Sequence, residues 1–280
     1  MSKNVVWISS YPKSGRTWLK ILMESILLYE GESTAINDLK VASTTTIKRD
    51  SFDQYFGLKS SDLTLEETWE YKRKYYLNMG ISKKSKSFIL THDENLILEN
   101  KKRLFPLEVT QSVIHIVRNP LSIVASLANH LKISIDESIE IMNSSSIQNP
   151  KNAFPATTTV YSKIGSWSSH LKSWINNAPY PVQLIRYEDL VENSLAVLKE
   201  LFRFLNHEVS EEIVLRAIEN TSFQKLALIE KAIGFKEKPS TSAGFFRKGK
   251  IDSWKEELTN KQIERVMKDH EAMMRKMGYL

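Results

Sequence analysis

The chain has 280 residues, of which 41% are hydrophobic, so it can form a large core in one domain or two. Cysteine is absent, which excludes disulfides, thiolate metal sites and a cysteine nucleophile, and which fits the cytoplasmic location that we expect. A net charge of +6 favours a polyanionic ligand, although mildly basic soluble proteins are common.

Several classes of protein do not fit the sequence. No apolar run approaches the roughly 20 residues of a membrane span, so we expect no transmembrane segment. The first strand begins by Val5, which leaves no room for a secretory signal. The six histidines are scattered without metal-ligand spacing, so no metal is expected. No RNA-recognition signature is present, and we expect no nucleic-acid partner.

The apolar, β-branched run at 5–8 predicts a strand buried on both faces. The Ser/Pro/Gly-rich residues 9–16 predict a tight loop, and apolar residues at helical spacing follow from Thr17. This order places Lys13 and Gly15 at a helix N-terminus, where free N–H groups and the helix dipole attract an anion. Gly15 lets the backbone approach that anion, while Lys13 adds charge and Thr17 a hydroxyl donor.

This loop has two interpretations when it is taken alone. It is not a Walker A motif, because no glycine lies five residues before Lys13 and Lys13 precedes Gly15. A Lys-Ser-Gly sequence after a strand is also an ordinary solvated turn. The rest of the chain has to decide between an anion site and a turn.

The later elements alternate between strands and helices. We predict further strands at 87–90, 112–117 and 182–187, and helices at 17–29, 63–79, 121–131, 164–175, 194–205, 210–219 and 256–277. Residues 30–62 are interpreted as a loop-rich insertion, and 230–253 have no clean period. Alternating strands and helices predict an α/β fold, with a central parallel sheet flanked by helices in a single domain over 1–280.

Polar residues follow all four predicted strands. They are the Lys13 loop, His92, Arg118 and Tyr187, the last followed at once by two acidic residues. Ligands of parallel α/β sheets bind at the carboxyl ends of the strands, so these groups are expected at one edge. Ser126 lies just over two helical turns beyond Arg118, and the two side chains could bind a second phosphate together.

Two stretches resemble a known family. Residues 11–18 resemble the phosphosulfate-binding loop of the cytosolic-type sulfotransferases, and 117–120 with Ser126 resemble their 3′-phosphate-binding segment. Further matches follow in order at Gly165-Ser166-Trp167 with His170, Tyr187-Glu188-Asp189-Leu190, Thr221-Ser222-Phe223, and Phe246-Arg247-Lys248-Gly249 with Trp254-Lys255. The matches run from residue 7 to residue 264. The composition, rich in Lys, Asn and Ile, looks like that of a bacterial member.

The resemblance implies a P-loop-nucleotide-hydrolase-like sulfotransferase fold and a donor, 3′-phosphoadenosine 5′-phosphosulfate (PAPS), with PAP as product. It assigns the 5′-phosphosulfate to Lys13, Ser14, Gly15, Arg16, Thr17 and Trp18. It assigns the 3′-phosphate to Arg118, Ser126, Arg247, Lys248 and Gly249, and the adenine to Trp18, Tyr187, Thr221 and Phe223. Ser222 and Phe246 belong to the same nucleotide-binding set. Arginine forks suit phosphate oxygens, and aromatic faces suit a planar base.

Three residues are expected to act in catalysis. His92 is the candidate general base, because an imidazole can remove a proton near neutral pH. A strand-end histidine bonded to the backbone is the alternative from the residues alone. Lys13 would stabilise charge on the bridging oxygen of the leaving nucleotide. The family implies that Ser126 holds Lys13 away from that oxygen until the acceptor arrives.

The chain departs from the family pattern at two places near this site. Many members have Thr where this chain has Arg16, and many have Lys where it has Leu90. One positive charge near the transferred group is therefore missing. We advance the speculation that Arg16 compensates for Leu90.

The C-terminal region carries part of a family dimer pattern. Lys255, Thr259 and Glu264 fit that pattern, but Asn260 replaces its Val. We therefore expect a weak homodimer or a monomer. The alternative is an ordinary helix start with Thr259 as the N-cap.

The expected reaction moves a sulfuryl group from PAPS to a hydroxyl of a small-molecule or lipid acceptor, an alcohol or a phenol. The alternatives are a P-loop phosphotransferase (kinase) that uses ATP and Mg²⁺, for which Asp189 is a poor acid, and a non-catalytic nucleotide-binding protein. An aromatic acceptor pocket and a packed core explain equally well the aromatic residues Phe52, Tyr55, Phe56, Tyr75, Tyr76 and Phe154.

Overall fold

The computed structural model describes residues 3–44, 46–144, 158–176, 178–238, 244–246 and 251–280. The chain divides into two compact units. The first unit comprises Met1–Tyr11, Ser43–His115 and Glu140–Leu184, and the second comprises Pro12–Ala42, Ile116–Ile139 and Ile185–Leu280.

A five-stranded sheet has the strand order β2-β3-β1-β4-β5. Its strands are β1 (Val5–Ser10), β2 (Ala42–Thr44), β3 (Ser87–Thr91), β4 (Thr110–Val117) and β5 (Val182–Arg186). Strands β1 and β3 pair in parallel, with Val5 opposite Ser87 and Ser9 opposite Thr91. The predicted α/β fold with a parallel sheet flanked by helices is confirmed.

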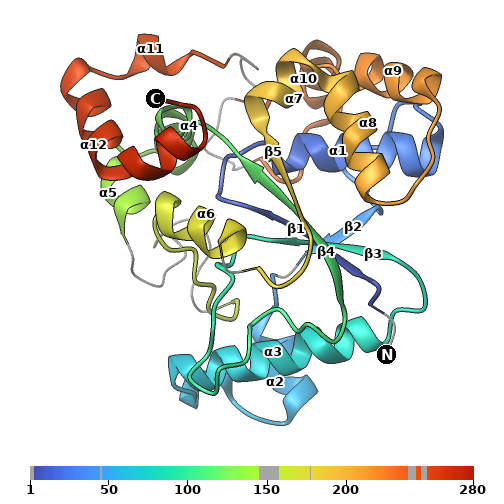
Figure 1. Cartoon of the computed structure of the whole chain (residues 1–280), viewed down its shortest axis with the longest axis vertical. Helices are drawn as coiled ribbons and strands as arrows, with labels where there is room; N and C mark the ends of the chain where they lie inside the picture. Colours follow the sequence, from blue (N-terminus) through green and yellow to red (C-terminus); the bar gives the residue numbers. More distant parts are fainter. Residues whose placement is uncertain (1–2, 45, 145–157, 177, 239–243, 247–250) are drawn as a thin grey trace. The chain divides into compact units, whose positions relative to one another are not determined.

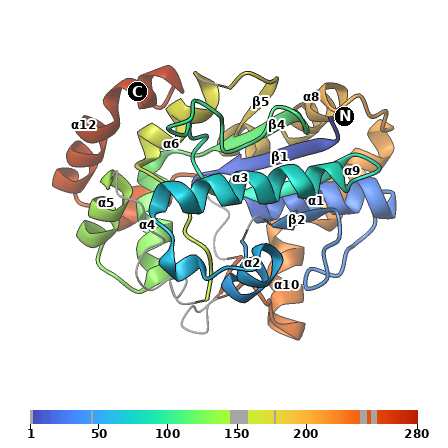
Figure 2. The same ribbon diagram turned by 90° about the horizontal axis from the view of Figure 1, so that it is seen from below.

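The core of the first unit is built around β1. All six residues of this strand are buried, as its continuous apolar start predicts. The Trp7 ring lies 4.8 Å from that of Phe105 and 5.4 Å from that of Tyr76, and its indole N–H donates to Thr110 Oγ1 at 2.9 Å. Because Tyr76 belongs to α3 (Leu65–Ile81), these contacts fasten that helix over β1 (Figure 2).

The remaining helices of the first unit are α2 (Arg49–Phe56), the short 3₁₀ helix η1 (Ser60–Asp62) and α6 (Trp167–Ile175). Helix α3 begins with a capping box between Thr64 and Glu67. The segment expected to be loop-rich, 30–62, thus holds β2, α2 and η1. β2 has only three residues, two of them exposed, so no apolar period marks it.

The second unit consists mainly of helices. They are α1 (Arg16–Tyr29), α4 (Pro120–Leu131), α7 (Tyr187–Glu192), α8 (Ser194–Phe204), α9 (Glu211–Asn220), α10 (Phe223–Ile233), α11 (Trp254–Glu257) and α12 (Asn260–Lys276), while α5 (Ile135–Asn143) begins in it. Helix α9 packs against both α1 and α8 (Figure 1). The sequence interpretation missed α10, which begins at Phe223, with only two residues between it and the end of α9.

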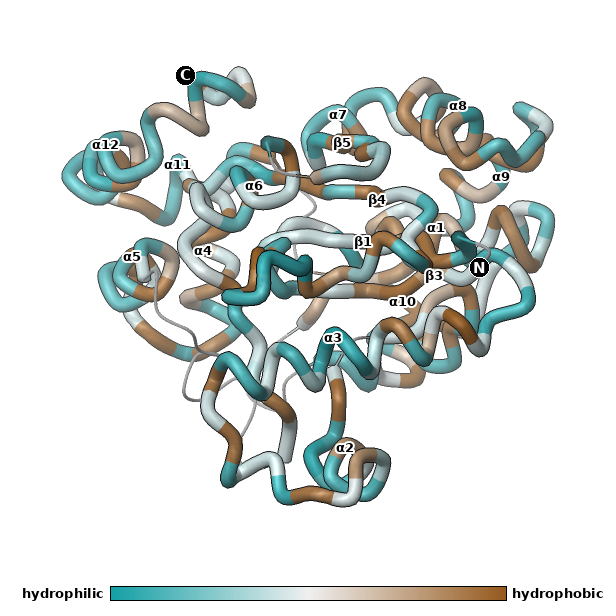
Figure 3. The backbone as a smooth tube through the Cα atoms, turned by 60° about the horizontal axis from the view of Figure 1, so that its bottom comes forward, coloured by the Kyte–Doolittle hydropathy of each residue, from teal (hydrophilic) through white to brown (hydrophobic). Residues whose placement is uncertain are grey.

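Helix α12 presents one buried face, on which Val266, His270, Met273 and Met274 lie. Most of its other residues are charged or polar, and the helix is coloured mainly teal in Figure 3. Thr259 caps it, accepting from the Gln262 N–H while the Gln262 side chain accepts from the Thr259 N–H. Thr259 therefore has the role given by the second interpretation of the dimer pattern, that of an ordinary N-cap.

The aromatic residues considered for an acceptor pocket are largely core residues. Phe52 and Tyr76 are fully buried in the hydrophobic cluster that also contains Trp7, and Phe56 and Tyr75 pack against it. Tyr55 is 52% exposed. Phe154 lies outside the described residues. In the described part of the chain, no helix is both long enough and apolar enough to cross a membrane.

His115 gives the first unit a measurable pH dependence. Burial, followed by the neighbouring His170, lowers the pKa of His115 well below its usual value. As the pH drops through about 6.5, His115 becomes protonated in the unfolded chain but stays neutral in the folded chain. The free energy of unfolding therefore falls as the pH drops through that value. The contribution of His115 to the free energy of unfolding should fall by about 1 kcal/mol between pH 7.5 and pH 5.5.

Urea unfolding of the wild type and of His115→Phe at both pH values checks this expectation. The variant should lose about 1 kcal/mol less free energy of unfolding on acidification than the wild type does. An equal loss in both proteins would show that His115 titrates normally in the folded state.

Candidate functional site

The loop after β1 forms an anion-binding shape at the start of α1. Lys13 and Gly15 both have positive φ, 71° and 96°, and such alternation turns backbone N–H groups toward a common point. Gly15 is the N-cap residue, with no side chain to bond the free N–H groups, and no acidic residue lies in the first turn. The positive end of the α1 dipole is therefore not neutralised by an acidic side chain in the first turn of the helix.

Gly15 is required by its neighbour as well as by its dihedral angles. A Cβ at this position would clash with Cδ2 and Cε2 of Tyr187, which begins α7. The close approach of the Gly15 backbone to this ring brings the loop and the start of α7 together. The sequence predicts that Gly15 lets the backbone approach an anion, and what the structure shows is its close approach to an aromatic ring.

Arg118 connects the same two segments. Its Nη1 donates to the carbonyl oxygen of Lys13 at 3.2 Å, and its guanidinium carbon lies 4.3 Å from the centroid of the Tyr187 ring. The guanidinium is thus stacked on an aromatic face and bonded to the loop backbone, which fixes its plane. Residues predicted from separate motifs, Lys13, Arg118 and Tyr187, are brought together in the second unit.

Three buried polar atoms around this loop have no hydrogen-bond partner among the described residues. They are Ser14 Oγ, Arg16 Nη1 and Arg118 Nε. Leaving buried donors unpaired costs roughly 1–3 kcal/mol each, so a ligand or an ordered water that accepts from them stabilises the protein. Carboxylate and phosphate oxygens are acceptors that guanidinium donors match well. The residues present therefore fit a ligand that carries anionic oxygens.

The Arg16 side chain lies near the carboxylate of Glu237. Burial lowers the pKa of its guanidinium to about 10, and Glu237 opposes the shift, so the side chain remains charged at neutral pH. The neighbouring Thr17 hydroxyl donates to Glu237 Oε2 at 3.1 Å. Leu90, the second departure noted in the sequence, is a buried residue of β3.

Most of the predicted adenine residues form one aromatic group. The Trp18 ring lies 5.3 Å from that of Phe223 and 6.1 Å from that of Tyr187, and its indole N–H donates to the Thr221 carbonyl at 3.0 Å. The Thr221 hydroxyl bonds the Ala217 carbonyl at the end of α9, so it serves that helix end. Ser222 is the N-cap residue of α10.

Phe246 joins this group from the C-terminal side. Its ring lies 6.2 Å from that of Phe223, and it is held in place by Glu230, whose carboxylate accepts from the N–H groups of Phe245 and Phe246 at 2.7 and 2.9 Å. Sequence reasoning missed Glu230. Arg247, Lys248 and Gly249, predicted to bind the 3′-phosphate, lie outside the described residues.

The Lys13 ammonium lies next to His130, a residue that the sequence analysis did not consider. Its Nζ lies 3.4 Å from Nδ1 of His130 and 5.0 Å from the centroid of the Phe245 ring. Burial and the Lys13 charge lower the pKa of His130 to about 4, so its neutral ring can accept from the ammonium at pH 7. Ser126 precedes His130 by one turn of α4, so the two residues share a face of that helix.

His92 belongs to the first unit and directly follows β3. The parallel register, with Ser9 opposite Thr91, brings it beside Ser10, and its Nδ1 lies 2.6 Å from the Ser10 carbonyl oxygen. A carbonyl can only accept, so Nδ1 carries the proton and Nε2 carries the lone pair. This tautomer suits a base that acts through Nε2.

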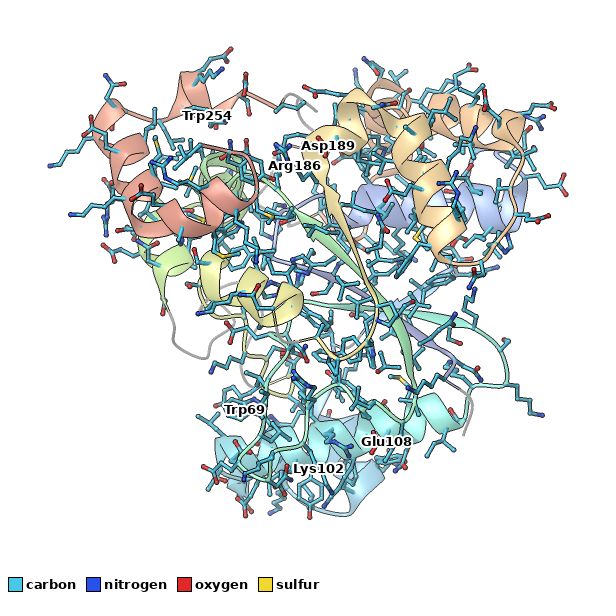
Figure 4. The ribbon with its side chains drawn as sticks, viewed as in Figure 1. Trp69, Lys102, Glu108, Arg186, Asp189 and Trp254 are labelled. Atoms are coloured by element: carbon cyan, nitrogen blue, oxygen red, sulfur yellow. The ribbon has the colours of Figure 1, made fainter. Side chains whose placement is uncertain are left out.

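Glu188 and Tyr279 support the segment around Arg118. The Glu188 carboxylate accepts from the Asn119 N–H at 2.9 Å and from the Tyr279 hydroxyl at 2.9 Å. Asp189, the weak candidate for a phosphotransferase acid, instead faces Arg186 at 3.6 Å (Figure 4). No sequence motif predicts that Tyr279 bonds Glu188, because the two residues lie far apart in the chain.

The chain matches the family model described as sulfotransferase domain over residues 3–278. Mouse sulfotransferase 1A1 is 27% identical over 266 residues, which cover 92% of this chain and 80% of that protein. The solved structure of mouse sulfotransferase SULT7A1 complexed with PAP has a TM-score of 0.61 at 19% identity and covers 98% of this chain and 84% of its own. That of retinol dehydratase with androsterone and inactive cofactor PAP has a TM-score of 0.61 at 16% identity, covering 98% and 81%.

The variant Gly15→Ala tests the loop. We expect PAP to bind at least tenfold more weakly, because the new Cβ adds strain at a positive φ and displaces the Tyr187 ring, which together cost about 1–2 kcal/mol or more. Isothermal titration calorimetry measures the affinity. Gly57→Ala is the matched control, since Gly57 also has a positive φ but a Cβ added there would meet no atom within 4 Å. Equal affinities for all three proteins would contradict the site.

Proposed function

The chain belongs to the sulfotransferase domain family, and from this membership we propose that it transfers a sulfuryl group from PAPS to a hydroxyl group of a small-molecule acceptor, with His92 as the general base. The observation that carries the proposal is the cluster of buried, unpartnered donors around the loop after β1: Ser14 Oγ, Arg16 Nη1 and Arg118 Nε. We propose further that residues 1–280 act as one sulfotransferase domain, which the extent of the family match supports.

The proposed reaction is a balanced group transfer. The bond between sulfur and the bridging oxygen of the phosphosulfate breaks, and a new bond forms between sulfur and the acceptor oxygen. The proton of the acceptor hydroxyl goes to the base, and PAP leaves with the electrons of the broken bond. PAPS supplies the activated sulfuryl group, and no oxidant or reductant takes part.

The second unit is proposed to bind the donor. The N–H groups at the start of α1, with Ser14 and Arg16, would hold the 5′-phosphosulfate, and Arg118 with Ser126 would hold the 3′-phosphate. The aromatic group of Trp18, Tyr187, Phe223 and Phe246 offers apolar faces to the adenine. Arg247, Lys248 and Gly249 remain part of the proposed 3′-phosphate site on the family resemblance alone.

His92 is proposed to remove the acceptor proton through Nε2. Support comes from the hydrogen bond of its Nδ1 to the Ser10 carbonyl, which fixes the tautomer and the plane of the ring. Ser10, which supplies this carbonyl, is buried at the end of β1. The alternative interpretation, a strand-end histidine bonded to the backbone, expects the same hydrogen bond. The bond is therefore compatible with a catalytic and with a structural role of His92.

Lys13 is proposed to stabilise the negative charge on the oxygen that leaves with PAP. Its ammonium lies near His130 Nδ1 and over the Phe245 ring. The proposed restraint of Lys13 by Ser126 would act from the same face of α4 as His130. Compensation of Leu90 by Arg16 stays a proposal, supported by the charge that Arg16 retains.

The acceptor is proposed to be an alcohol or phenol on a small molecule or a lipid. The structural neighbour retinol dehydratase was solved with androsterone, an alcohol, and PAP, which supports this class. Radiolabelled PAPS with 2-naphthol and with androsterone as acceptors, and detection of the sulfated products by mass, would test it. A weak homodimer and a cytoplasmic location stay predictions.

His92→Ala should reduce the rate of sulfuryl transfer by at least a hundredfold, because general-base catalysis contributes about 10²–10⁴-fold. PAP affinity should stay within twofold, since His92 is not among the residues proposed to bind the donor. Product formation and calorimetric titration of PAP measure the two effects. His207→Ala, at an exposed histidine, is the control. Wild-type turnover by His92→Ala would refute the base.

A chelator separates the proposed reaction from a Mg²⁺-dependent phosphotransferase. Turnover with PAPS should be unchanged by excess EDTA, because the proposed charge stabilisation comes from Lys13, Arg16 and Arg118 instead of a metal ion. Turnover is compared with and without EDTA, with PAPS and with ATP as donors. Transfer from ATP that disappears with EDTA would favour the phosphotransferase.

A further inference from the structure

A buried ion pair lies next to His92 in the first unit. Lys72 of α3 donates from Nζ to Asp93 Oδ2 at 2.7 Å, and both side chains are only 1% exposed. The Tyr76 hydroxyl, one turn further along α3, donates to the same carboxylate oxygen at 3.2 Å. The aspartate is the residue that directly follows His92.

Both members of the pair use their remaining bonding capacity. The Lys72 ammonium also donates to the Tyr161 carbonyl at 3.0 Å and to Ser162 Oγ at 3.3 Å, so all three of its N–H groups have acceptors. The second oxygen of Asp93 accepts from the Lys163 N–H at 3.0 Å. The pair therefore joins α3, the segment 161–163 and the end of β3 by directional bonds.

The backbone of Asp93 is fixed as well. Its N–H donates to Thr91 Oγ1 at 3.0 Å, and its carbonyl accepts from the Trp174 indole N–H of α6 at 3.1 Å. His92 lies between Thr91, which is in the β-sheet ladder, and Asp93. The imidazole can bond the Ser10 carbonyl only if the backbone on both sides holds its position.

Stability alone does not account well for this arrangement. The cost of removing two charges from water often exceeds their attraction, and apolar side chains of similar volume are often equally good or better in such places. What an ion pair with many bonds provides is a single, narrowly defined geometry. The residue directly before this fixed aspartate in the chain is His92.

We propose that Lys72 and Asp93 are positioning residues that hold His92 in the orientation and tautomer in which its Nε2 takes the acceptor proton. This role rests on the proposed function of His92 as the base. Lys72 and Asp93 act through the backbone at 91–93 and through the Ser10 bond, and neither needs to touch the substrate.

The first readout is the tautomer of His92, which requires no acceptor. Nitrogen-15 NMR of histidine-labelled protein, with the His92 signals assigned from their loss in His92→Gln, should show Nδ1 protonated in the wild type. In Lys72→Met and in Asp93→Asn both tautomers should be populated. Lys74→Met, at an exposed lysine of the same helix, is the matched control and should keep the wild-type tautomer.

The second readout separates positioning from stability. Each single variant leaves a buried charge or donor without its partner, so either protein could fail to fold. The double variant Lys72→Met with Asp93→Leu leaves neither charge of the pair, so it should be more stable in urea than either single variant, although the Tyr76 hydroxyl and the Lys163 N–H lose their acceptor. Its kcat with PAPS and 2-naphthol should nevertheless be at least tenfold lower, with the Kd for PAP within twofold of the wild type. A structural role would restore kcat together with stability.

Two results overturn the inference. One is a wild-type His92 tautomer in the folded variants, and the other is a wild-type kcat in the double variant. The His92→Ala variant distinguishes failure of the positioning role from failure of the proposed function. If His92→Ala is inactive while the double variant is fully active, only the positioning role is wrong. If His92→Ala is fully active, the base assignment itself is wrong.

Discussion

The stacked guanidinium of Arg118 is the constraint on which the proposed donor site depends. It lies on the Tyr187 ring and bonds the Lys13 carbonyl, so the end of β4, the start of α7 and the loop after β1 are fixed by one side chain. Gly15 is required because the same ring would collide with any Cβ there. Glu188 then holds Asn119 and Tyr279, which extends the fixed region to the C-terminus.

Charge in this protein is buried in two different ways. In the second unit Arg16 and Arg118 keep buried nitrogen donors that the described residues do not use, which suits a site that must take an anion from solution. In the first unit Lys72 and Asp93 are fully bonded to protein groups. Unused donors favour a ligand, whereas saturated ones favour a fixed geometry for a neighbouring residue.

The sequence predicted the parts whose physical signal is local. The apolar run of β1, the glycine loop and the helix that follows are contiguous, so Lys13, Gly15 and Trp18 could be placed from the chain itself. Contacts between distant segments carry no such signal, and His130, Glu230 and the Lys72–Asp93 pair were missed for that reason. The family resemblance assigned Arg118, Tyr187 and Phe223 to one nucleotide-binding site. The periodicity of the sequence alone could not connect these three residues.

Calorimetric comparison of PAP with adenosine 5′-phosphate tests the central claim most directly, because the two ligands differ only in the 3′-phosphate. Arg118 is proposed to bond this group, and charge-assisted hydrogen bonds contribute about 1.5–3 kcal/mol each. Two such bonds predict that the wild type binds PAP at least a hundredfold more tightly, and that Arg118→Ala loses most of this preference. Equal affinity of the wild type for both nucleotides would contradict the account.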